Sequence, residues 1–172
     1  MVMKITDKTT VGDALLVMKN VDFQDQMIPF TQVELPEMTY GQRIDLSEIK
    51  TFLDLIILPS KILLGMNEDK IMAQSFIRCC NFGRSVVKEL NRLATRDQKA
   101  FKYQPSPEEV KAGYYDMNHG VFATVDRIAQ RLSIGHDDVF ALPEKRVFAM
   151  LKIDFDNMIY RKKFNEIISK KK

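Results

Sequence analysis

Few residues of the types that commonly carry catalysis or bind metals occur in this chain of 172 residues. Its two histidines are His119 and His136, and neither has a second histidine three or four residues away, the spacing at which helical metal sites pair their ligands. His136 with Asp137 and Asp138 offers ligand types for a metal. Two carboxylates at that point are more typical of the first turn of a helix, where they face the positive end of its dipole. We therefore expect no metal, no cofactor and no catalytic residue.

The cysteines and glycines add no reactive motif. Cys79 and Cys80 are adjacent, which suits neither a disulfide framework nor a CxxC site. Their apolar surroundings predict buried, unreactive thiols, and a reducing, intracellular setting fits them best. The sequence has neither the dinucleotide nor the Walker glycine pattern for binding phosphate. An enzyme is therefore the weakest functional class for this chain.

The segment IAQRLSIGHDDVFAL, residues 128–142, has the small and apolar residues of a DNA-binding helix-turn-helix. Its turn has Ser133 where a glycine is usual, and the second helix would begin with two carboxylates that repel DNA phosphates. Pro143 would also end that helix early. An ordinary corner between two helices is the favoured interpretation.

A long run from Ser106 to Leu132 is the strongest helix signal in the chain. Ser106 and Glu109 form a capping box, in which each side chain accepts from the backbone of the other. Apolar residues then recur at alternating spacings of four and three, which places them on one face of a helix: Val110, Tyr114, Met117, Val121, Val125, Ile128 and Leu132. Gly113 and Gly120 lie within this run, and each weakens a helix by about 1 kcal/mol relative to Ala. We expect them to mark close backbone packing.

Capping residues predict further helices before and after this run. Thr10 with Asp13 and Thr39 with Gln42 each form a capping pair, and Asn67 can cap a third helix. Together with the apolar spacing, these signals predict helices near residues 11–19, 39–58, 67–94, 138–142 and 157–169.

These elements predict an all-α (mainly α) fold, a helical bundle of about five to six helices with an extended N-terminal segment and a basic C-terminal helix. The 45% of hydrophobic residues, with eleven Phe and ten Met, are enough for a substantial core. The expected organisation is a short helix and extended segment over residues 1–38, a helical core over 39–156, and a basic C-terminal helix over 157–172.

Charge and hydropathy limit the partners that we expect. The whole chain carries a net charge of +3, whereas Lys145 to Lys172 has nine Lys and Arg against three Asp and Glu, so the basic charge lies in the C-terminal segment. The first ten residues contain no apolar run of signal-peptide length. The longest apolar stretch, Phe52 to Met66, is interrupted by polar residues and falls short of a bilayer span. We expect no membrane partner.

Two segments are candidates for contacts with other subunits. Residues 21–38 lose helical periodicity and contain FTQVEL, which alternates like an extended strand; a surface loop is the alternative interpretation. The basic C-terminal helix could dock on a second subunit or bind an acidic partner such as nucleic acid, and a solvated, frayed terminus is the alternative. The candidate interface residues are Met27, Ile28, Phe30, Val33, Leu35, Arg161, Lys162, Lys163, Phe164, Ile167 and Ile168.

Several phrases resemble one group of known proteins. They are MTYGQRIDLSEI, PEEVKAG, VFATVDRIAQRL, DDVFALPEKRVFAMLKID and YRKKFNEI, which together span residues 38–168. In this order they resemble small structural and assembly proteins of tailed bacteriophages, particularly phages of Bacteroides-type hosts. Those proteins are head-to-tail connectors, neck rings and tail-assembly chaperones. The matching phrases are helix caps and packing positions, so the resemblance implies no catalytic residue.

The resemblance implies a non-enzymatic virion assembly protein, a ring-forming head-to-tail connector, neck or tail component. Its partners would be other copies of itself in a closed homo-oligomeric ring and other virion proteins such as portal or tail components. It would be assembled in the host cytoplasm and be located in the virion. The alternatives are a tail-assembly chaperone that is absent from the mature virion, and a small nucleic-acid-binding regulator.

Overall fold

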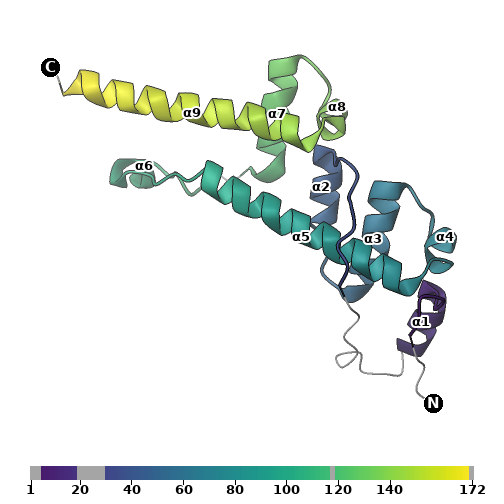
Figure 1. Cartoon of the computed structure of the whole chain (residues 1–172). Helices are drawn as coiled ribbons and strands as arrows, with labels where there is room; N and C mark the ends of the chain where they lie inside the picture. The colour runs from purple at the N-terminus through teal and green to yellow at the C-terminus, as the bar shows by residue number, and fades with distance from the viewer. Residues whose placement is uncertain (1–4, 19–29, 117–118, 171–172) are drawn as a thin grey trace. The chain divides into compact units, whose positions relative to one another are not determined.

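The computed structural model of the chain describes residues 5–18, 30–116 and 119–170, and these residues are predominantly helical (Figure 1). Its helices are α1 (Val11–Met18), α2 (Tyr40–Leu46), α3 (Phe52–Leu64), α4 (Glu68–Met72), α5 (Phe76–Ala100), α6 (Pro107–Lys111), α7 (Gly120–Leu132), α8 (His136–Ala141) and α9 (Glu144–Ser169). Within the described residues there is no β-strand, so the all-α prediction is confirmed. The helices outnumber the expected five to six because three of the expected long helices are each divided in two.

The chain forms two compact units. Unit 1 comprises Met1–Met38 and Gln42–Leu93, and unit 2 comprises Thr39–Gly41 and Ala94–Lys172. The expected division at residue 38 lies at one of these boundaries. Helix α9, however, begins at Glu144 and continues without a break past residue 157, so the expectation of a separate C-terminal helix was wrong. No proline or glycine interrupts residues 144–169, and nothing in the sequence ends the helix at 156.

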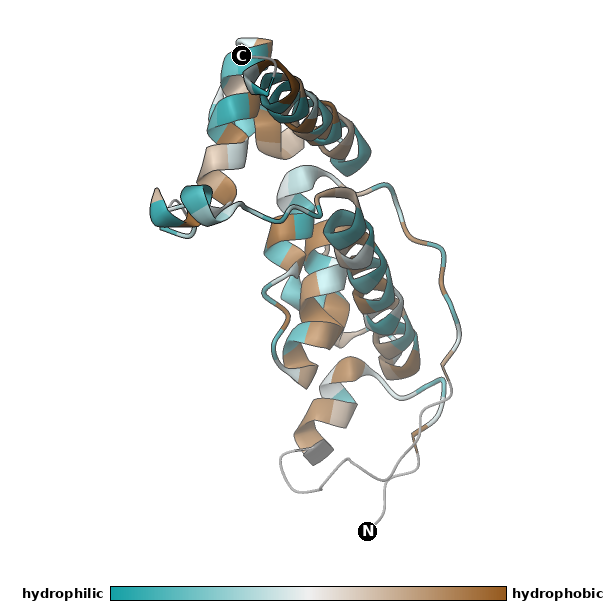
Figure 2. Ribbon diagram, turned by 90° about the vertical axis from the view of Figure 1, so that its left-hand side faces the viewer, coloured by the Kyte–Doolittle hydropathy of each residue, from teal (hydrophilic) through white to brown (hydrophobic). Residues whose placement is uncertain are grey.

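Unit 1 is built around the N-terminal part of α5. One core cluster joins α1, α3 and α5 through the buried residues Val11, Ala14, Ile56, Phe76, Cys79 and Cys80. A second cluster contains Met38, Leu46, Phe82 and Val86. Hydrophobic residues gather in α3 and in this part of α5 (Figure 2). A Cβ on Gly83 would lie 2.0 Å from the carbonyl oxygen of Leu55, so α5 and α3 approach each other as closely as glycine allows.

Two of the helix caps described in unit 1 were predicted from the sequence, and one was not. Thr10 and Asp13 cap α1 as predicted, with the Asp13 amide donating to Thr10 Oγ1 at 3.1 Å. Asn67 caps α4, whose Lys70 amide donates to it at 3.0 Å. A capping box of Thr51 with Asp54, not among the predicted caps, starts α3 and divides the predicted helix 39–58.

Pro59 lies inside a helix. The predicted helix 39–58 stops directly before this residue, but Pro59 is buried within α3, which continues to Leu64. It lies in the third turn of that helix, and the real end is Gly65, which has the left-handed φ of 61° that glycine adopts readily. Similarly, α4 ends at Met72, and the predicted helix 67–94 begins again at Phe76.

The predicted long helix from Ser106 to Leu132 is two helices in unit 2. The Ser106–Glu109 capping box is present, with Ser106 N donating to Glu109 Oε2 at 2.7 Å. Gly113 and Gly120 have φ values of 87° and 56°, which end α6 and begin α7. A Cβ on Gly120 would meet no atom within 4 Å, so the expectation of close packing was wrong there. Glycine is used at this position for its backbone conformation.

Helices α7, α8 and α9 form the core of unit 2, with the buried residues Val125, Ile128, Ala129, Val139, Val147 and Met150. The α7–α8 connection turns at Ser133, which has a left-handed φ of 54°. Asp138 accepts from the Gly135 amide at 3.1 Å, so a carboxylate caps α8. Residues 128–141 thus form two helices joined by a short turn, with a carboxylate at the start of the second helix.

Candidate interaction surface on helix α9

Helix α9 has apolar residues on two opposite sides. An α-helix turns by about 100° per residue, so residues seven, eleven and fourteen positions apart lie on one side. The inner face packs in unit 2 and includes Val147, Leu151, Phe155 and Ile159, which are buried or half-buried. On the opposite side lie five large side chains that are each between 44% and 66% exposed. We call this set the outer face: Ile153, Tyr160, Phe164, Ile167 and Ile168.

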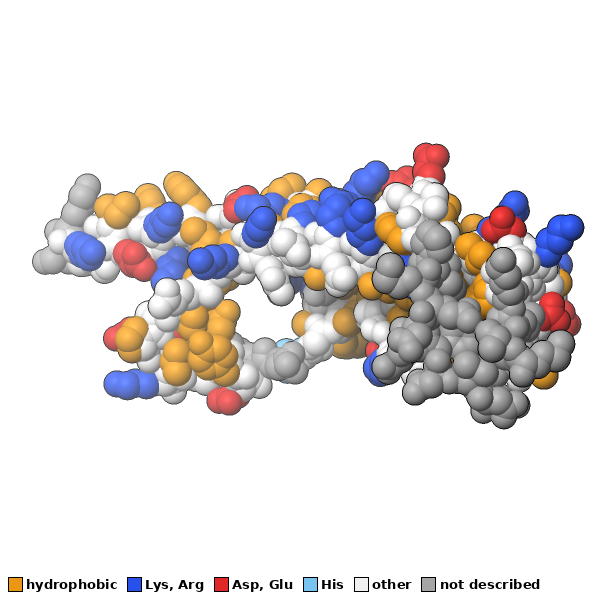
Figure 3. All heavy atoms as spheres, turned by 60° about the horizontal axis from the view of Figure 1, so that its bottom comes forward, with side chains coloured by type: hydrophobic (Ala, Val, Ile, Leu, Met, Phe, Trp, Pro, Cys, Tyr) orange, Lys and Arg blue, Asp and Glu red, His pale blue; other side chains and the backbone are white. Residues whose placement is uncertain are grey.

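The outer face is continuous at its centre. The rings of Tyr160 and Phe164 stack with centroids 6.0 Å apart and an interplanar angle of 17°. In the space-filling view, hydrophobic side chains and Lys or Arg side chains lie together along the C-terminal part of α9 (Figure 3). A helix that is apolar on two opposite sides normally has both sides covered, so the outer face is a candidate interaction surface.

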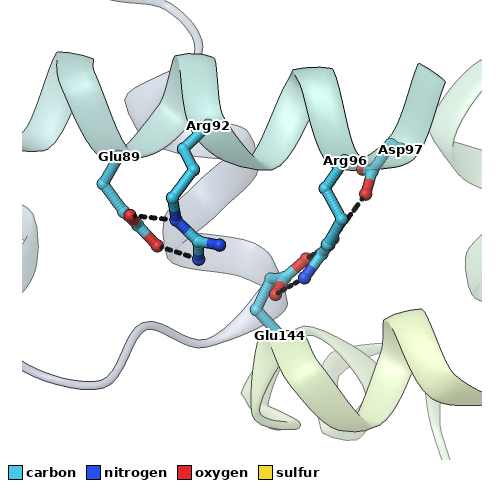
Figure 4. Close-up of polar contacts among 5 residues, drawn as sticks. All are labelled: Glu89, Arg92, Arg96, Asp97 and Glu144. Atoms are coloured by element: carbon cyan, nitrogen blue, oxygen red, sulfur yellow. Dashed lines mark hydrogen bonds and ion pairs between the residues drawn. The ribbon is translucent and has the colours of Figure 1, made fainter. Parts of the chain in front are cut away.

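The inner face is fixed at its N-terminal end by a charged pair. Glu144 is 4% exposed, and both of its carboxylate oxygens accept from the guanidinium of Arg96 on α5, one of them at 3.1 Å from Nη1 (Figure 4). The same guanidinium donates to Asp97 and lies 3.6 Å above the ring of Phe148. This pairing satisfies a carboxylate that would otherwise be costly to bury.

Two further contacts hold α9 along its length. Arg131 of α7 donates to Asp154 at 2.8 Å. Lys162 Nζ donates to Glu109 Oε2 and to the hydroxyl of Tyr103, both at 2.7 Å, and Tyr103 in turn donates to Glu109 Oε1 at 2.6 Å. The orientation of α9 in unit 2 is therefore fixed by contacts of its inner face, and these contacts do not involve the outer face.

The Lys162 contact changes the electrostatics of both partners. Hydrogen bonds from Lys162, from Tyr103 and from the Ser106 amide lower the pKa of Glu109 to about 2. The hydrogen bonds with Glu109 and Tyr103 raise the pKa of Lys162 above its ordinary value. Lys162 was predicted as an interface residue, but it is engaged within unit 2.

The other predicted residues of this helix lie at the surface. Arg161, Lys163, Phe164, Ile167 and Ile168 are all exposed. The last three belong to the outer face, and the two cations flank it. Ile153 and Tyr160 were not among the predicted interface residues, because the C-terminal helix was expected to begin only at residue 157. A signal was available, since residues 153, 160, 164 and 167 keep helical spacing with one another.

The predicted interface residues of the N-terminal segment have different environments. Met27 and Ile28 lie outside the described residues. Phe30 is exposed, with the ammonium of Lys88 5.8 Å from its ring centroid. Val33 and Leu35 are half-buried against the second core cluster of unit 1, so their side chains pack within their own subunit.

Backbone contacts hold the same segment on unit 1. Val33 N donates to Ser85 Oγ at 3.0 Å, and Thr31 N donates to Asn81 Oδ1 at 3.3 Å. Both acceptors are buried side chains on α5. The described part of this segment therefore packs as an extended cover on its own unit, with Phe30 as its exposed large apolar residue.

Groups that could carry chemistry are dispersed. Burial raises the pKa of the Cys80 thiol to about 11, and burial also raises that of Cys79, so neither favours a thiolate. His136 Nε2 lies 3.4 Å from Asp126 Oδ1, and its ring meets Phe122 edge-on with centroids 5.2 Å apart. In the part of the chain that the structure describes, no group of three or more His, Cys, Asp or Glu could hold a metal ion.

Among the described helices, none is both long and apolar enough to cross a membrane. The outer face of α9 is the feature of the described residues on which a function can be proposed. Comparisons with protein-family models, with curated proteins and with solved structures found no match to the chain.

Proposed function

We propose that the chain is a non-enzymatic bacteriophage virion assembly protein, a ring-forming head-to-tail connector, neck or tail component. The observation that carries the proposal is the outer face of α9, which exposes five large apolar side chains on a helix that is already fixed by its inner face. The resemblance of the phrases in residues 38–168 to phage assembly proteins supports the same assignment. The function would be adhesion between subunits.

The size of the outer face favours assembly through several weak contacts. Full burial of a large apolar side chain contributes about 1.5–3 kcal/mol, so covering five half-exposed ones contributes about 5 kcal/mol in total. Association costs about 4–15 kcal/mol in lost freedom of motion. One such contact between two molecules would therefore be weak. A closed ring gives every subunit two neighbours, and breaking it requires two contacts to be lost.

The direct test is the mass of the purified chain in solution. Mass photometry over a range of concentrations should give one closed oligomer of defined subunit number, in equilibrium with monomer. A variant with Phe164→Ser and Ile167→Ser should shift this equilibrium to monomer while retaining its helical circular dichroism. A wild-type chain that stays monomeric at every concentration would contradict the proposal.

A second measurement separates a virion component from a tail-assembly chaperone. Exposed apolar surface would also suit a chaperone that binds an aggregation-prone partner. Mass spectrometry of purified particles from the phage that encodes the chain should find it at a fixed ratio to the portal protein. Its absence from mature particles, with presence in infected cells, would favour the chaperone.

Nucleic-acid binding is the remaining alternative, and it is favoured by the exposed cations Arg161, Lys163 and Lys170. Lys162 contributes less than the sequence suggested because Glu109 neutralises it. Binding of duplex DNA through phosphates would weaken steeply with salt. If the chain does not bind duplex DNA, or if its affinity for DNA does not change with salt, the assembly function is the better explanation.

A further inference from the structure

The outer face of α9 has the spacing of a coiled coil. Ile153, Asn157, Tyr160, Phe164 and Ile167 are separated by four, three, four and three residues, which places them at alternating d and a positions of two heptads. The inner face lies on the opposite side of the helix and is used within unit 2. Helix α9 can therefore pair through one side while it stays packed through the other.

Two residues on or beside this line indicate the kind of partner. Asn157 is exposed and is the one polar residue among the five a and d positions. In a parallel, in-register pair, an Asn at position a faces the same Asn of its partner and can exchange hydrogen bonds with it. In an antiparallel pair, position a faces position d, so Asn157 would lie against an apolar residue and would lose its hydrogen bonds. The polar position therefore favours a parallel pair of identical helices.

Charge complementarity points to the same arrangement. Asp156 is at position g and Arg161 is at position e of the next heptad, and both are exposed. In parallel coiled coils, position g of one helix lies beside the following e position of its partner. Asp156 of each copy would thus lie beside Arg161 of the other. Within one chain, Asp156 is paired with Lys152, an exposed contact that still leaves a carboxylate oxygen for Arg161.

We propose that α9 binds α9 of a second copy of this chain, in parallel and in register, through Ile153, Asn157, Tyr160, Phe164 and Ile167. The helix does not have to form on binding, because its inner face already packs in unit 2, so the ordering cost that limits short isolated coiled coils is absent. Parallel helices are related by a rotation axis along their length. An in-register pair closes about a two-fold axis, so this contact by itself joins two copies, and a larger ring needs a second, different contact. The inference rests on the proposed function and deepens it by naming one contact between subunits.

Disulfide trapping in the full-length chain tests whether two copies of α9 pair in parallel and in register. In the variant Asn157→Cys, the new thiols of two parallel helices would face each other at a distance that a disulfide can bridge. Mild oxidation should convert this variant to a covalent dimer on a non-reducing gel. The matched control is Asn165→Cys, which replaces an exposed residue of the same type at position b, outside the contact. It should stay monomeric, as should the wild-type chain with its buried Cys79 and Cys80.

The outcomes separate this inference from the proposed function. If Asn157→Cys does not cross-link although mass photometry shows an oligomer, the parallel contact is wrong and the assembly function stands. If Asn157→Cys cross-links with Ile167→Cys in a mixture but not with itself, the helices are antiparallel and the inference is overturned. Equal cross-linking of Asn157→Cys and Asn165→Cys would mean random collision and would also overturn it. If the wild-type chain is monomeric at every concentration, both proposals fail.

Discussion

The two long helices, α5 and α9, use their apolar residues differently. The N-terminal part of α5 places its apolar residues against α1, α3 and the segment around Met38, and its other side carries charged residues such as Lys88 and Arg92. Helix α9 has two apolar sides, and among the described residues only the inner one is covered. The N-terminal part of α5 therefore serves the stability of its own subunit. Helix α9 combines a stabilising side with a side that is available to a partner.

The largest expected effect comes from the close approach of α5 to α3. Gly83→Ala would place a Cβ 2.0 Å from the backbone oxygen of Leu55, and the backbone can relieve this only by moving the helices apart. We expect a loss of about 4 kcal/mol in unfolding free energy, measured by urea denaturation. Gly65→Ala is the control, because its Cβ would meet no atom, and its positive φ should cost about 1 kcal/mol. Equal losses for the two variants would refute the packing argument.

The second prediction is that two arginines of α5, Arg96 and Arg92, contribute differently to stability (Figure 4). Arg96→Met would leave the buried carboxylate of Glu144 without its guanidinium partner and should cost about 3 kcal/mol. Arg92→Met removes an equally well-aligned pair with Glu89, but the Arg92 side chain is 61% exposed. It should therefore cost less than about 1 kcal/mol. Urea denaturation of both variants measures the difference, and similar costs would show that burial of Glu144 is unimportant.

The third prediction concerns the outer face of α9. Phe164→Ser should weaken self-association by about tenfold or more, because it removes a central apolar contact of the proposed pair. Met158→Ser is the control, since Met158 is similarly exposed, 45% against 49%, but lies outside the outer face. Mass photometry measures the self-association of both variants. Urea denaturation should show that the two variants are about equally stable as monomers. Equal weakening by the two substitutions would exclude the outer face as a specific contact.

A smaller effect tests the charge pair of the proposed contact. Asp156→Arg alone and Arg161→Asp alone each place like charges side by side in a homodimer, and each should weaken self-association about threefold at low salt. A mixture of the two variants restores opposite charges and should assemble better than either variant alone. The difference should fade at high salt. A mixture that assembles no better than its components would argue against the parallel register.

The smallest effect is the pH dependence that arises from Glu109. Its pKa of about 2 in the folded chain lies below the ordinary 4.5, so its ionised form stabilises the fold fully above pH 4.5 and loses this contribution as the pH falls toward 2. As the pH is lowered from 4.5 to 2, the urea concentration at the midpoint of unfolding should fall less steeply in Glu109→Gln and in Lys162→Met than in the wild-type chain. The effect is small because both side chains are near the surface. If the midpoint falls equally with pH in the wild-type chain and in both variants, the Glu109–Lys162 contact does not contribute to stability.

Local features of this protein could be predicted from neighbouring residues alone. Capping pairs such as Ser106 with Glu109 act over three residues, and apolar spacing identified the core positions Val125 and Ile128 of α7. The all-α class followed from these. Three of the five residues of the outer face were also recognised, Phe164, Ile167 and Ile168, because their apolar spacing can be read along one helix.

The tertiary structure decided which of these residues are covered. Gly113 and Gly120 fit a helical pattern by spacing, yet in the structure their positive φ values end one helix and begin the next. Val33 and Leu35 looked equally suited to a neighbouring subunit until their contacts with α5 became visible. Lys162 could not be separated from Arg161 and Lys163 by sequence, because its partner Glu109 is 53 residues away. A sequence pattern shows which side of a helix is apolar, whereas burial depends on residues distant in the chain.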